Sequence, residues 1–235
     1  MRLIQPPQLE EPGDCPYLPG RKKRYEFFLA GQLDGVELSC YLAEGWRKFG
    51  LYYFRPACPD CRACTPLRIP VAEFTPTREQ RRVLKRAASL GVNFGPLQLS
   101  DRAYAIYREH ARRRFGLEAN PEEFLLNFYL PSCPAMQSEI FVGEETAGIG
   151  YLDIGADCLS SVYFAFDPAY AAYNPGTFSI LKEIEQARAL GLNWYYLGYY
   201  VAECRSLAYK DRFRPRQHRD WRTGQWRTVD MSPHP

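Results

Sequence analysis

Apolar and polar residues alternate along several short stretches of the chain, which is the spacing of strands with one buried face. These stretches are also rich in aromatic and β-branched residues, which favour strands. The predicted strands span residues 24–29, 52–55, 67–71, 139–143, 147–154, 160–166 and 194–198. Residues 1–14 are rich in proline and glutamate and predict an extended arm, and residues 36–49 predict a strand followed by a helix.

The clearest helical pattern begins after Pro76. Thr77 and Gln80 have the spacing of a capping box, and Gly91 is a typical residue at a helix end. With helical spacing, apolar side chains fall on one face and cations on the other. The cations are Arg78, Arg81, Arg82, Lys85 and Arg86. Such a stripe is either a solvated face or a surface for an anion, and nucleic-acid phosphate is the natural anion.

Further helices are predicted at residues 101–115, 120–123 and 177–190. Antiparallel strands followed by a helix and another strand indicate an α+β fold. This order is compatible with the acetyltransferase-like fold, in which a strand splays and the next helix begins at the donor's phosphates. Gly176 and Thr177 supply such a helix start, where free backbone N–H groups attract anions. Many helices without a ligand begin in the same way.

Composition and charge narrow the classes of protein. The chain has 235 residues and a net charge of +3, with 46% hydrophobic residues, as ordinary globular proteins have. Positive charge is concentrated in the tail from Arg205 to Arg227, which holds eight Arg or Lys against two Asp. No apolar run approaches the roughly 18 residues of a membrane span, and the N-terminus lacks a signal-peptide core. We therefore expect a cytoplasmic protein without a membrane partner.

The cysteines suggest a metal site. Cys58, Cys61 and Cys64 are each separated by two residues, a spacing that suits chelation of one metal or cluster, and Cys15 is the candidate fourth ligand. Zinc and iron–sulfur sites share this spacing, so either is compatible. The alternative is reduced thiols in a loop, since disulfides are rare inside cells. The other cysteines, Cys40, Cys133, Cys158 and Cys204, are predicted to be buried structural residues.

Several strings together resemble one family. They are CPYLP at 15–19, YFRPACPDCRAC at 53–64, RIPV at 68–71, FTPTREQRR at 74–82, SSVYFAFDP at 160–168, GTFSIL at 176–181 and YLGYY at 196–200, followed by Cys204, Tyr209, Lys210 and residues 213–215. In order and spacing over about 200 residues, they resemble the bacterial aspartate/glutamate leucyltransferases and, more distantly, the eukaryotic arginyl-tRNA–protein transferases.

This resemblance implies a cysteine-bearing N-terminal region, residues 1–95, and a C-terminal acetyltransferase-like (GNAT-like) domain, residues 96–235. It implies a charged tRNA as donor and acceptor proteins with an acidic N-terminal residue, marked in this way for degradation. No organic cofactor is expected. The short chain and the Cys-x2-Cys-x2-Cys form resemble the leucyl branch. Departures from the family pattern at 173–176, Leu18 and 207–208 leave arginine open as the donated residue.

Candidate site residues follow from this chemistry. A carboxylate acceptor needs a cation, and Arg68, Arg205 and Lys210 are candidates. The predicted catalytic residues in the matching strings are Tyr163, Asp167, Tyr199 and Tyr209. A tyrosine hydroxyl can polarise the ester or relay a proton, and Asp167 can orient the amine. Each tyrosine can equally be a core residue, and Asp167 a turn residue. His110, His218 and His234 form no constellation in the sequence.

The tRNA is expected to contact the 78–86 stripe and the basic tail, with a terminal phosphate at Gly176 and Thr177. Two other classes share some of these features. An acyl-CoA-dependent N-acetyltransferase would use the same fold and helix start without needing the basic stripe. A non-catalytic zinc-ribbon RNA-binding protein would explain the cysteines and the charge, but not the tyrosine-rich strings.

Overall fold

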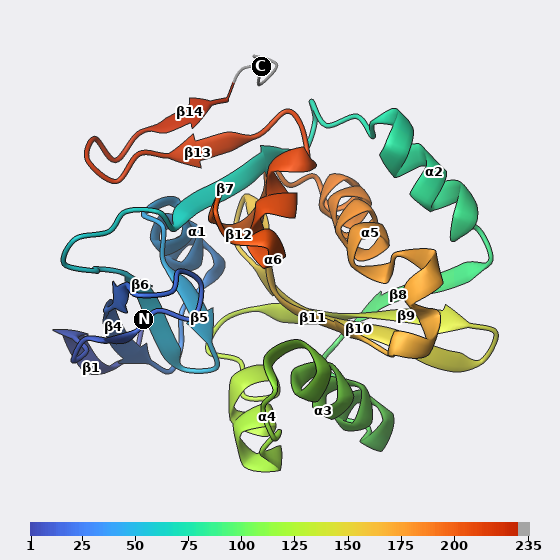
Figure 1. The fold of residues 1–235 in the computed structure, drawn as a ribbon, viewed down its shortest axis with the longest axis horizontal. Helices are drawn as coiled ribbons and strands as arrows, with labels where there is room; N and C mark the ends of the chain where they lie inside the picture. The colour runs from blue at the N-terminus through green and yellow to red at the C-terminus, as the bar shows by residue number, and fades with distance from the viewer. Residues whose placement is uncertain (230–235) are drawn as a thin grey trace.

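An eight-stranded sheet forms the centre of the computed structural model, which describes residues 1–229 (Figure 1). Its strands lie in the order β14 (Trp226–Thr228), β13 (Gln217–Arg219), β7 (Thr65–Pro70), β12 (Trp194–Tyr200), β11 (Cys158–Phe166), β10 (Glu145–Ile154), β9 (Ala135–Val142) and β8 (Leu90–Gly95). The sequence thus predicted most of the central strands, and the α+β fold class is confirmed.

A smaller sheet lies beside the central one. It has the order β1 (Leu3–Leu9), β4 (Tyr25–Ala30), β6 (Tyr52–Pro56) and β5 (Arg47–Phe49), all antiparallel, and a separate short pair is formed by β2 (Gly13–Asp14) and β3 (Lys22–Lys23). Aromatic residues of this sheet pack with α1 (Gly35–Ala43), for example Phe28 against Trp46. The predicted N-terminal arm is therefore in part the edge strand β1.

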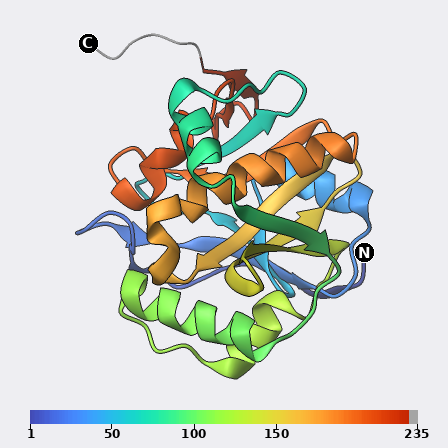
Figure 2. The ribbon, with the colours of Figure 1, turned by 90° about the vertical axis from the view of Figure 1, so that its right-hand side faces the viewer.

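Helices cover both faces of the central sheet (Figure 2). On one face α5 (Pro175–Ala189) packs against β11 and β12, with α2 (Arg78–Arg86) beside it. On the other face α3 (Asp101–Phe115) and α4 (Pro121–Phe128) cover β10 and β11. Buried apolar clusters lie under each pair of helices, and a further cluster lies between α1 and the smaller sheet. Short helical turns, η1 (Pro168–Tyr173), α6 (Arg205–Ala208) and η2 (Tyr209–Arg212), lie outside these layers.

Local sequence explains where the helices begin. Asp34 and Thr77 each form a capping box, with Glu37 and Gln80 respectively, and Ser100 caps α3. The Asp34 box starts a helix in residues 36–49, so the predicted order of strand then helix is wrong: α1 comes first and β5 follows. The predicted helix after Pro76 is also shorter than expected, because it ends at Arg86 and Leu90 begins β8.

The central sheet opens between β11 and β12. These strands are parallel and pair only through Cys158–Ser160 with Trp194–Tyr196. Beyond these residues β12 follows β7, with a register shift around Gly198, whose φ is 95°. The strands on the other side, β9, β10 and β11, stay antiparallel and paired over most of their lengths. A gap between two strands of the sheet follows from this geometry.

Residues from both sides of position 95 build the central sheet, since β7 and β8 precede it and the other strands follow it. The boundary between an N-terminal region and a C-terminal domain at this position stays a prediction. Within residues 1–229, no helix is long and apolar enough to cross a membrane.

Candidate active site

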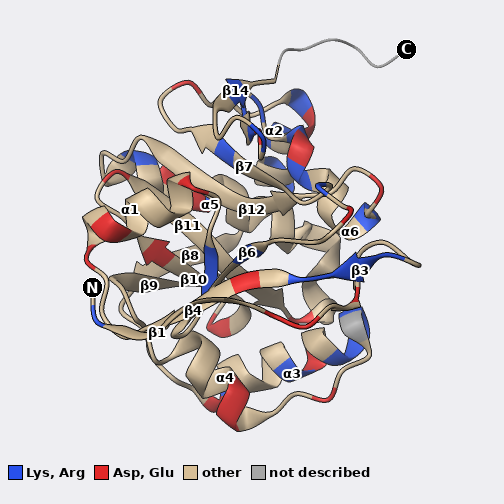
Figure 3. Ribbon diagram, turned by 90° about the vertical axis from the view of Figure 1, so that its left-hand side faces the viewer, with Lys and Arg blue, Asp and Glu red and all other residues tan. Residues whose placement is uncertain are grey.

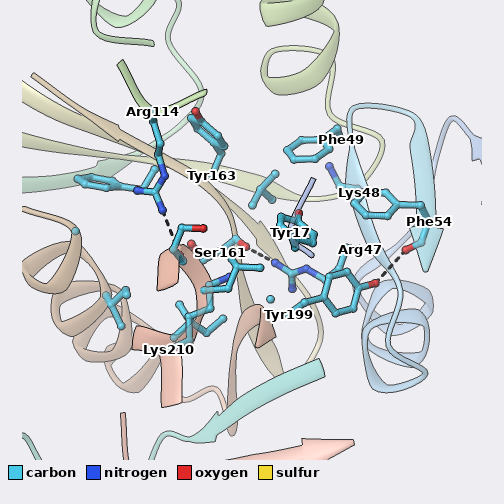
Figure 4. A pocket seen from close by; sticks show the side chains of 18 of the residues that line it. Tyr17, Arg47, Lys48, Phe49, Phe54, Arg114, Ser161, Tyr163, Tyr199 and Lys210 are labelled. Atoms are coloured by element: carbon cyan, nitrogen blue, oxygen red, sulfur yellow. Dashed lines mark hydrogen bonds between the residues drawn. The ribbon is translucent and has the colours of Figure 1, made fainter. Parts of the chain in front are cut away.

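A cavity of about 450 Å³ lies where β11 and β12 part (Figure 4). Its walls come from the smaller sheet, from both parted strands, from α3 and α5, and from the segment after β12. The chain brings these segments together from residues 10–54, 110–114, 161–183 and 197–210. The apolar part of the wall is largely aromatic, and the polar part is dominated by cations.

Arg47 occupies the point where the strands separate. Its guanidinium donates to the Ser160 hydroxyl at 2.9 Å and to the Ser161 carbonyl (Figure 4). That carbonyl belongs to the part of β11 that has no pairing with β12. Surrounding protein lowers the pKa of Arg47 from its usual value, although an arginine remains charged at neutral pH. A strand of the smaller sheet therefore supplies hydrogen bonds to the open edge of the larger one.

Lys210 enters the same cavity from η2. Burial, together with the nearby charges of Arg47 and Arg114, lowers the pKa of Lys210 to about 7. The lysine lies over Gly198: a Cβ at that position would be 3.0 Å from the Lys210 Nζ and 3.7 Å from the Arg47 Nη2. The cationic groups of both residues are thus close to one point of β12, and the glycine leaves the space between them open.

The three predicted catalytic tyrosines all line the cavity. Burial raises the pKa of each, so their hydroxyls stay protonated at neutral pH. Tyr199 donates to the Gly45 carbonyl at 2.8 Å, and the Tyr163 hydroxyl lies 3.1 Å from the His110 Nδ1. The Tyr209 hydroxyl has no hydrogen-bond partner among the described residues. The Tyr209 hydroxyl can therefore bind a ligand without losing a hydrogen bond within the described part of the protein.

One buried carboxyl group also lines the cavity. Glu183 of α5 accepts hydrogen bonds of 2.5 Å from the hydroxyls of Ser179 and Tyr195. Burial raises the pKa of Glu183, which favours its neutral form. The hydroxyls of Ser179 and Tyr195 act in the opposite direction, because the hydrogen bonds they donate favour the charged form.

Other predicted site residues lie outside the cavity wall. Asp167 pairs with Arg102 at 2.7 Å and caps η1 through the Ala169 N–H, as the turn alternative described. Arg68 lies between Trp194 and Trp226, with its guanidinium 3.6 Å and 4.4 Å from the two ring centroids. The structure does not bring either residue to the three tyrosines.

The remaining binding candidates are distributed over the surface. Gly176 lines the cavity at the start of α5, whereas Thr177 is not part of its wall, and Arg205 is exposed. The five cations of α2 are exposed, and we call them the ridge of α2; Figure 3 colours their positions blue on the ribbon. Their binding roles stay predictions. His234 falls outside the described residues, and His218 lies on β13, away from the cavity.

The predicted metal ligands gather in one region. Besides burial, the neighbouring thiols of Cys58, Cys15, Cys61 and Cys204 raise the pKa of Cys64, to about 12. Thiolates suit zinc or an iron–sulfur cluster, but among residues 1–229 no three His, Cys, Asp or Glu side chains are arranged to hold a metal ion. The metal therefore stays a prediction. Cys204 was expected to be buried, yet it joins this group, and Cys40 is exposed.

Arg47, Glu183 and His110 are cavity residues that the sequence did not single out as site residues. Arg47 lies in the segment whose order of elements was wrong, and its partner Ser160 is 113 positions away in the chain. Glu183 lies on a helix that was predicted, but no local pattern distinguishes it from a surface glutamate. Only the folded chain shows that these residues meet.

The amino-acid sequence matches the models of one protein family and several of its members. The profile of the arginine-tRNA-protein transferase C terminus matches residues 102–220, and that of the N terminus matches residues 13–82. The chain is 35% identical to the aspartate/glutamate leucyltransferase of Chromobacterium violaceum over 93% of this chain and 91% of that protein. It is 36% identical to the aspartate/glutamate leucyltransferase of Thiobacillus denitrificans over 87% of each chain.

Among solved structures, L-PGS from Bacillus licheniformis is similar with a TM-score of 0.48 and 12% identity, over 70% of this chain and 51% of that chain.

Proposed function

The chain belongs to the arginine-tRNA-protein transferase family, and we propose that it transfers leucine from leucyl-tRNA to the N-terminal aspartate or glutamate of acceptor proteins. The observation that carries this proposal is the match to aspartate/glutamate leucyltransferases over about nine tenths of the chain. The match includes both the segments that contribute the smaller sheet and those that contribute the parted strands. The protein is thus an aminoacyltransferase, and its modified acceptors would be marked for degradation in the cytoplasm.

The reaction is an aminolysis. The nitrogen of the acceptor's α-amino group attacks the ester carbonyl carbon of leucyl-tRNA, an amide bond forms, and the bond between that carbon and the ribose oxygen breaks. The amine loses a proton and the ribose oxygen gains one. An α-amino group has a pKa of about 7.7 to 8.0, so a useful fraction is neutral at physiological pH. The enzyme therefore needs mainly to align two substrates, and no covalent intermediate is required.

Residue roles follow from the cavity wall. Tyr209 is proposed as the hydroxyl that donates to the ester carbonyl or the leaving oxygen, because its hydroxyl is protonated and has no partner among the described residues. Tyr163 is proposed as a second donor, held by His110 at 3.1 Å. Tyr199 already donates to a backbone carbonyl, so its proposed role is to position the wall. Asp167 has no role in this proposal.

The tRNA is proposed to lie across α2 and the basic tail, with its 3′ end entering the cavity past Gly176, which lines the start of α5. A helix start with free N–H groups suits a phosphate there. Zinc or an iron–sulfur cluster at the cysteine region stays part of the proposal as a structural element. Its ligands would be the thiols of Cys15, Cys58, Cys61 and Cys64.

The test is a transfer assay with purified protein, radiolabelled leucyl-tRNA or arginyl-tRNA, and peptides that begin with Asp, Glu or Ala. We expect leucine to enter only the Asp and Glu peptides. Arginine incorporation instead would keep the reaction class and change the donor. If neither tRNA supports transfer by the folded protein, the transferase proposal fails. Acetyl transfer from acetyl-CoA to the same peptides would then identify the acetyltransferase alternative.

A further inference from the structure

Two cations converge on one side of the cavity from distant parts of the chain. Arg47 comes from β5 and Lys210 from η2, and both line the space beside β12 (Figure 4). Resting on the proposed function, we propose that Arg47 and Lys210 together bind the side-chain carboxylate of the acceptor's N-terminal residue and so determine acceptor specificity. Nothing in the sequence of residues 36–49 had indicated such a role for Arg47.

Within residues 1–229, Arg47 and Lys210 lack counter-ions. Two other cations of the cavity wall form ion pairs: Lys48 contacts Asp153 at 2.9 Å and Lys23 contacts Glu10 at 3.3 Å. Neither Arg47 nor Lys210 forms an ion pair with any carboxylate in the described part of the chain. Enclosing unpaired charge costs free energy, so a protein keeps it mainly where a ligand supplies the partner.

The cationic groups of Arg47 and Lys210 both lie close to Gly198. A Cβ there would lie 3.0 Å from the Lys210 Nζ and 3.7 Å from the Arg47 Nη2, so both cationic groups surround one small space. A carboxylate is flat and has two acceptor oxygens, which can bond a guanidinium and an ammonium at the same time. Arg47 keeps donors available, because among residues 1–229 its hydrogen bonds go only to the Ser160 hydroxyl and the Ser161 carbonyl.

A pair of cations would also select acidic N-terminal residues over their amides. The neutral amide of an N-terminal Asn or Gln would leave both cations without a charged partner. Sites built around enclosed polar groups reject analogues that leave those groups unpaired, by factors of roughly 10⁴ in favourable cases. A phosphate of the tRNA is the competing anion. The ridge of α2 already offers exposed cations for phosphates, whereas Arg47 is held between two strands inside the cavity wall.

The test uses the full chain with the substitution Lys210→Met, a folded control Lys182→Met on the outer face of α5, and Arg47→Lys as a second variant. Kinetics are measured with a peptide that begins with Asp, and the matching Asn peptide is measured as an inhibitor. We expect the KM for the Asp peptide to rise by at least about tenfold in Lys210→Met, because an ion pair is lost. The Asn peptide should bind equally to wild type and variant, so the preference for Asp disappears.

The KM for leucyl-tRNA shows whether Arg47 and Lys210 bind the acceptor's carboxylate or a phosphate of the tRNA. It should change little in both variants if the cations bind the acceptor. A rise in the KM for leucyl-tRNA with an unchanged preference for Asp over Asn would overturn the inference in favour of a phosphate site. Equal loss for both peptides would overturn it in favour of a structural role. If the wild-type protein transfers leucine to no peptide, the proposed function itself fails, and this outcome is distinct from unchanged discrimination by an active variant.

Discussion

At the scale of single residues, the cavity depends on a glycine that no other residue replaces without cost. Gly198 has a φ of 95°, in the region that L side chains avoid, and it faces Lys210. The same residue marks the register shift where β12 leaves β11 and follows β7. Backbone conformation, strand pairing and the position of a cation therefore meet at one residue.

The substitution Gly198→Ala tests this dependence. A left-handed conformation costs an L residue roughly 1–2 kcal/mol, and the new Cβ would also press against the Lys210 Nζ. We expect lower thermal stability and a higher KM for acidic peptides. Gly95→Ala is the matched control, because nothing lies within 4 Å of its added Cβ. Equal effects of the two substitutions in thermal unfolding and transfer assays would contradict this explanation.

The charge of Lys210, which we propose binds the acceptor, should also lower the stability of the fold. Burial and the charges of Arg47 and Arg114 disfavour its protonated form, while Cys204 acts in the opposite direction. Its pKa is about 7 in the fold and near 10.4 in an unfolded chain, so folding is penalised most below pH 7 and less as pH rises between these values. We expect Lys210→Met to raise the Tm at pH 6 by several degrees and at pH 9 by less. A lower Tm at pH 6 would count against this account.

Sequence predicted some single residues of the site and missed others. Tyr163, Tyr199, Tyr209 and Lys210 lie in strings that resemble a family, and all four line the cavity. No local sequence pattern identifies Arg47 as a site residue, because its place in the cavity depends on a hydrogen bond to Ser160, 113 positions away in the chain. Resemblance finds residues that share a motif, whereas it does not find residues that meet only through tertiary contacts.

At the scale of elements, most helices and central strands were predictable because their apolar periodicity is local, and α2, α3 and α4 also have side-chain caps. The failures have a common cause. The strands β13 and β14 have three residues each, and β8 contains two glycines, so pairing with neighbouring strands defines these three more than their own residues do. The parting of β11 and β12 was expected from the acetyltransferase-like order, but its position at Ser160 was not.

The ridge of α2 leads to a prediction at this scale (Figure 3). Arg81 and Arg86 also bond to backbone carbonyls, so the cleaner substitutions are Arg78→Gln, Arg82→Gln and Lys85→Gln combined. If α2 contacts tRNA phosphates, the KM for leucyl-tRNA should rise. Each lost contact should also reduce the slope of log affinity against log salt by about 0.7–0.9.

The control for α2 is a double variant on α3, Arg112→Gln with Arg113→Gln, because these arginines pair with Glu109 on the surface. It should leave the salt dependence of tRNA binding unchanged. Binding measured over a range of salt concentrations decides the matter: identical slopes for wild type and the α2 variant would show that this ridge is a solvated face.

At the scale of the whole molecule, an enclosed ion pair joins the two sheets. Lys48 of β5 contacts Asp153 of β10 at 2.9 Å, and their side chains are 5% and 4% exposed. Burial lowers the pKa of Lys48, but Asp153 and Cys133 together outweigh this effect and raise the pKa overall. Lys48 is adjacent to Arg47 in the sequence, so the ion pair fixes the same strand that supplies a cation to the cavity.

Breaking this pair should uncouple the sheets. Lys48→Met would leave Asp153 enclosed without a partner, and such losses typically cost about 3–5 kcal/mol in the free energy of unfolding. Adding Asp153→Leu should recover most of that stability, because no isolated charge then remains. Denaturant unfolding of both variants measures this difference. A double variant as unstable as the single one would mean that packing rather than charge determines the loss.

The hydrogen bonds of Arg47 to the open edge of β11 have one more consequence. The guanidinium occupies the Ser161 carbonyl, which β12 would need as an acceptor in order to pair further along β11. The two strands therefore stay apart when the cavity is empty. The binding space is then preorganised, and substrates do not have to spend binding energy on opening it.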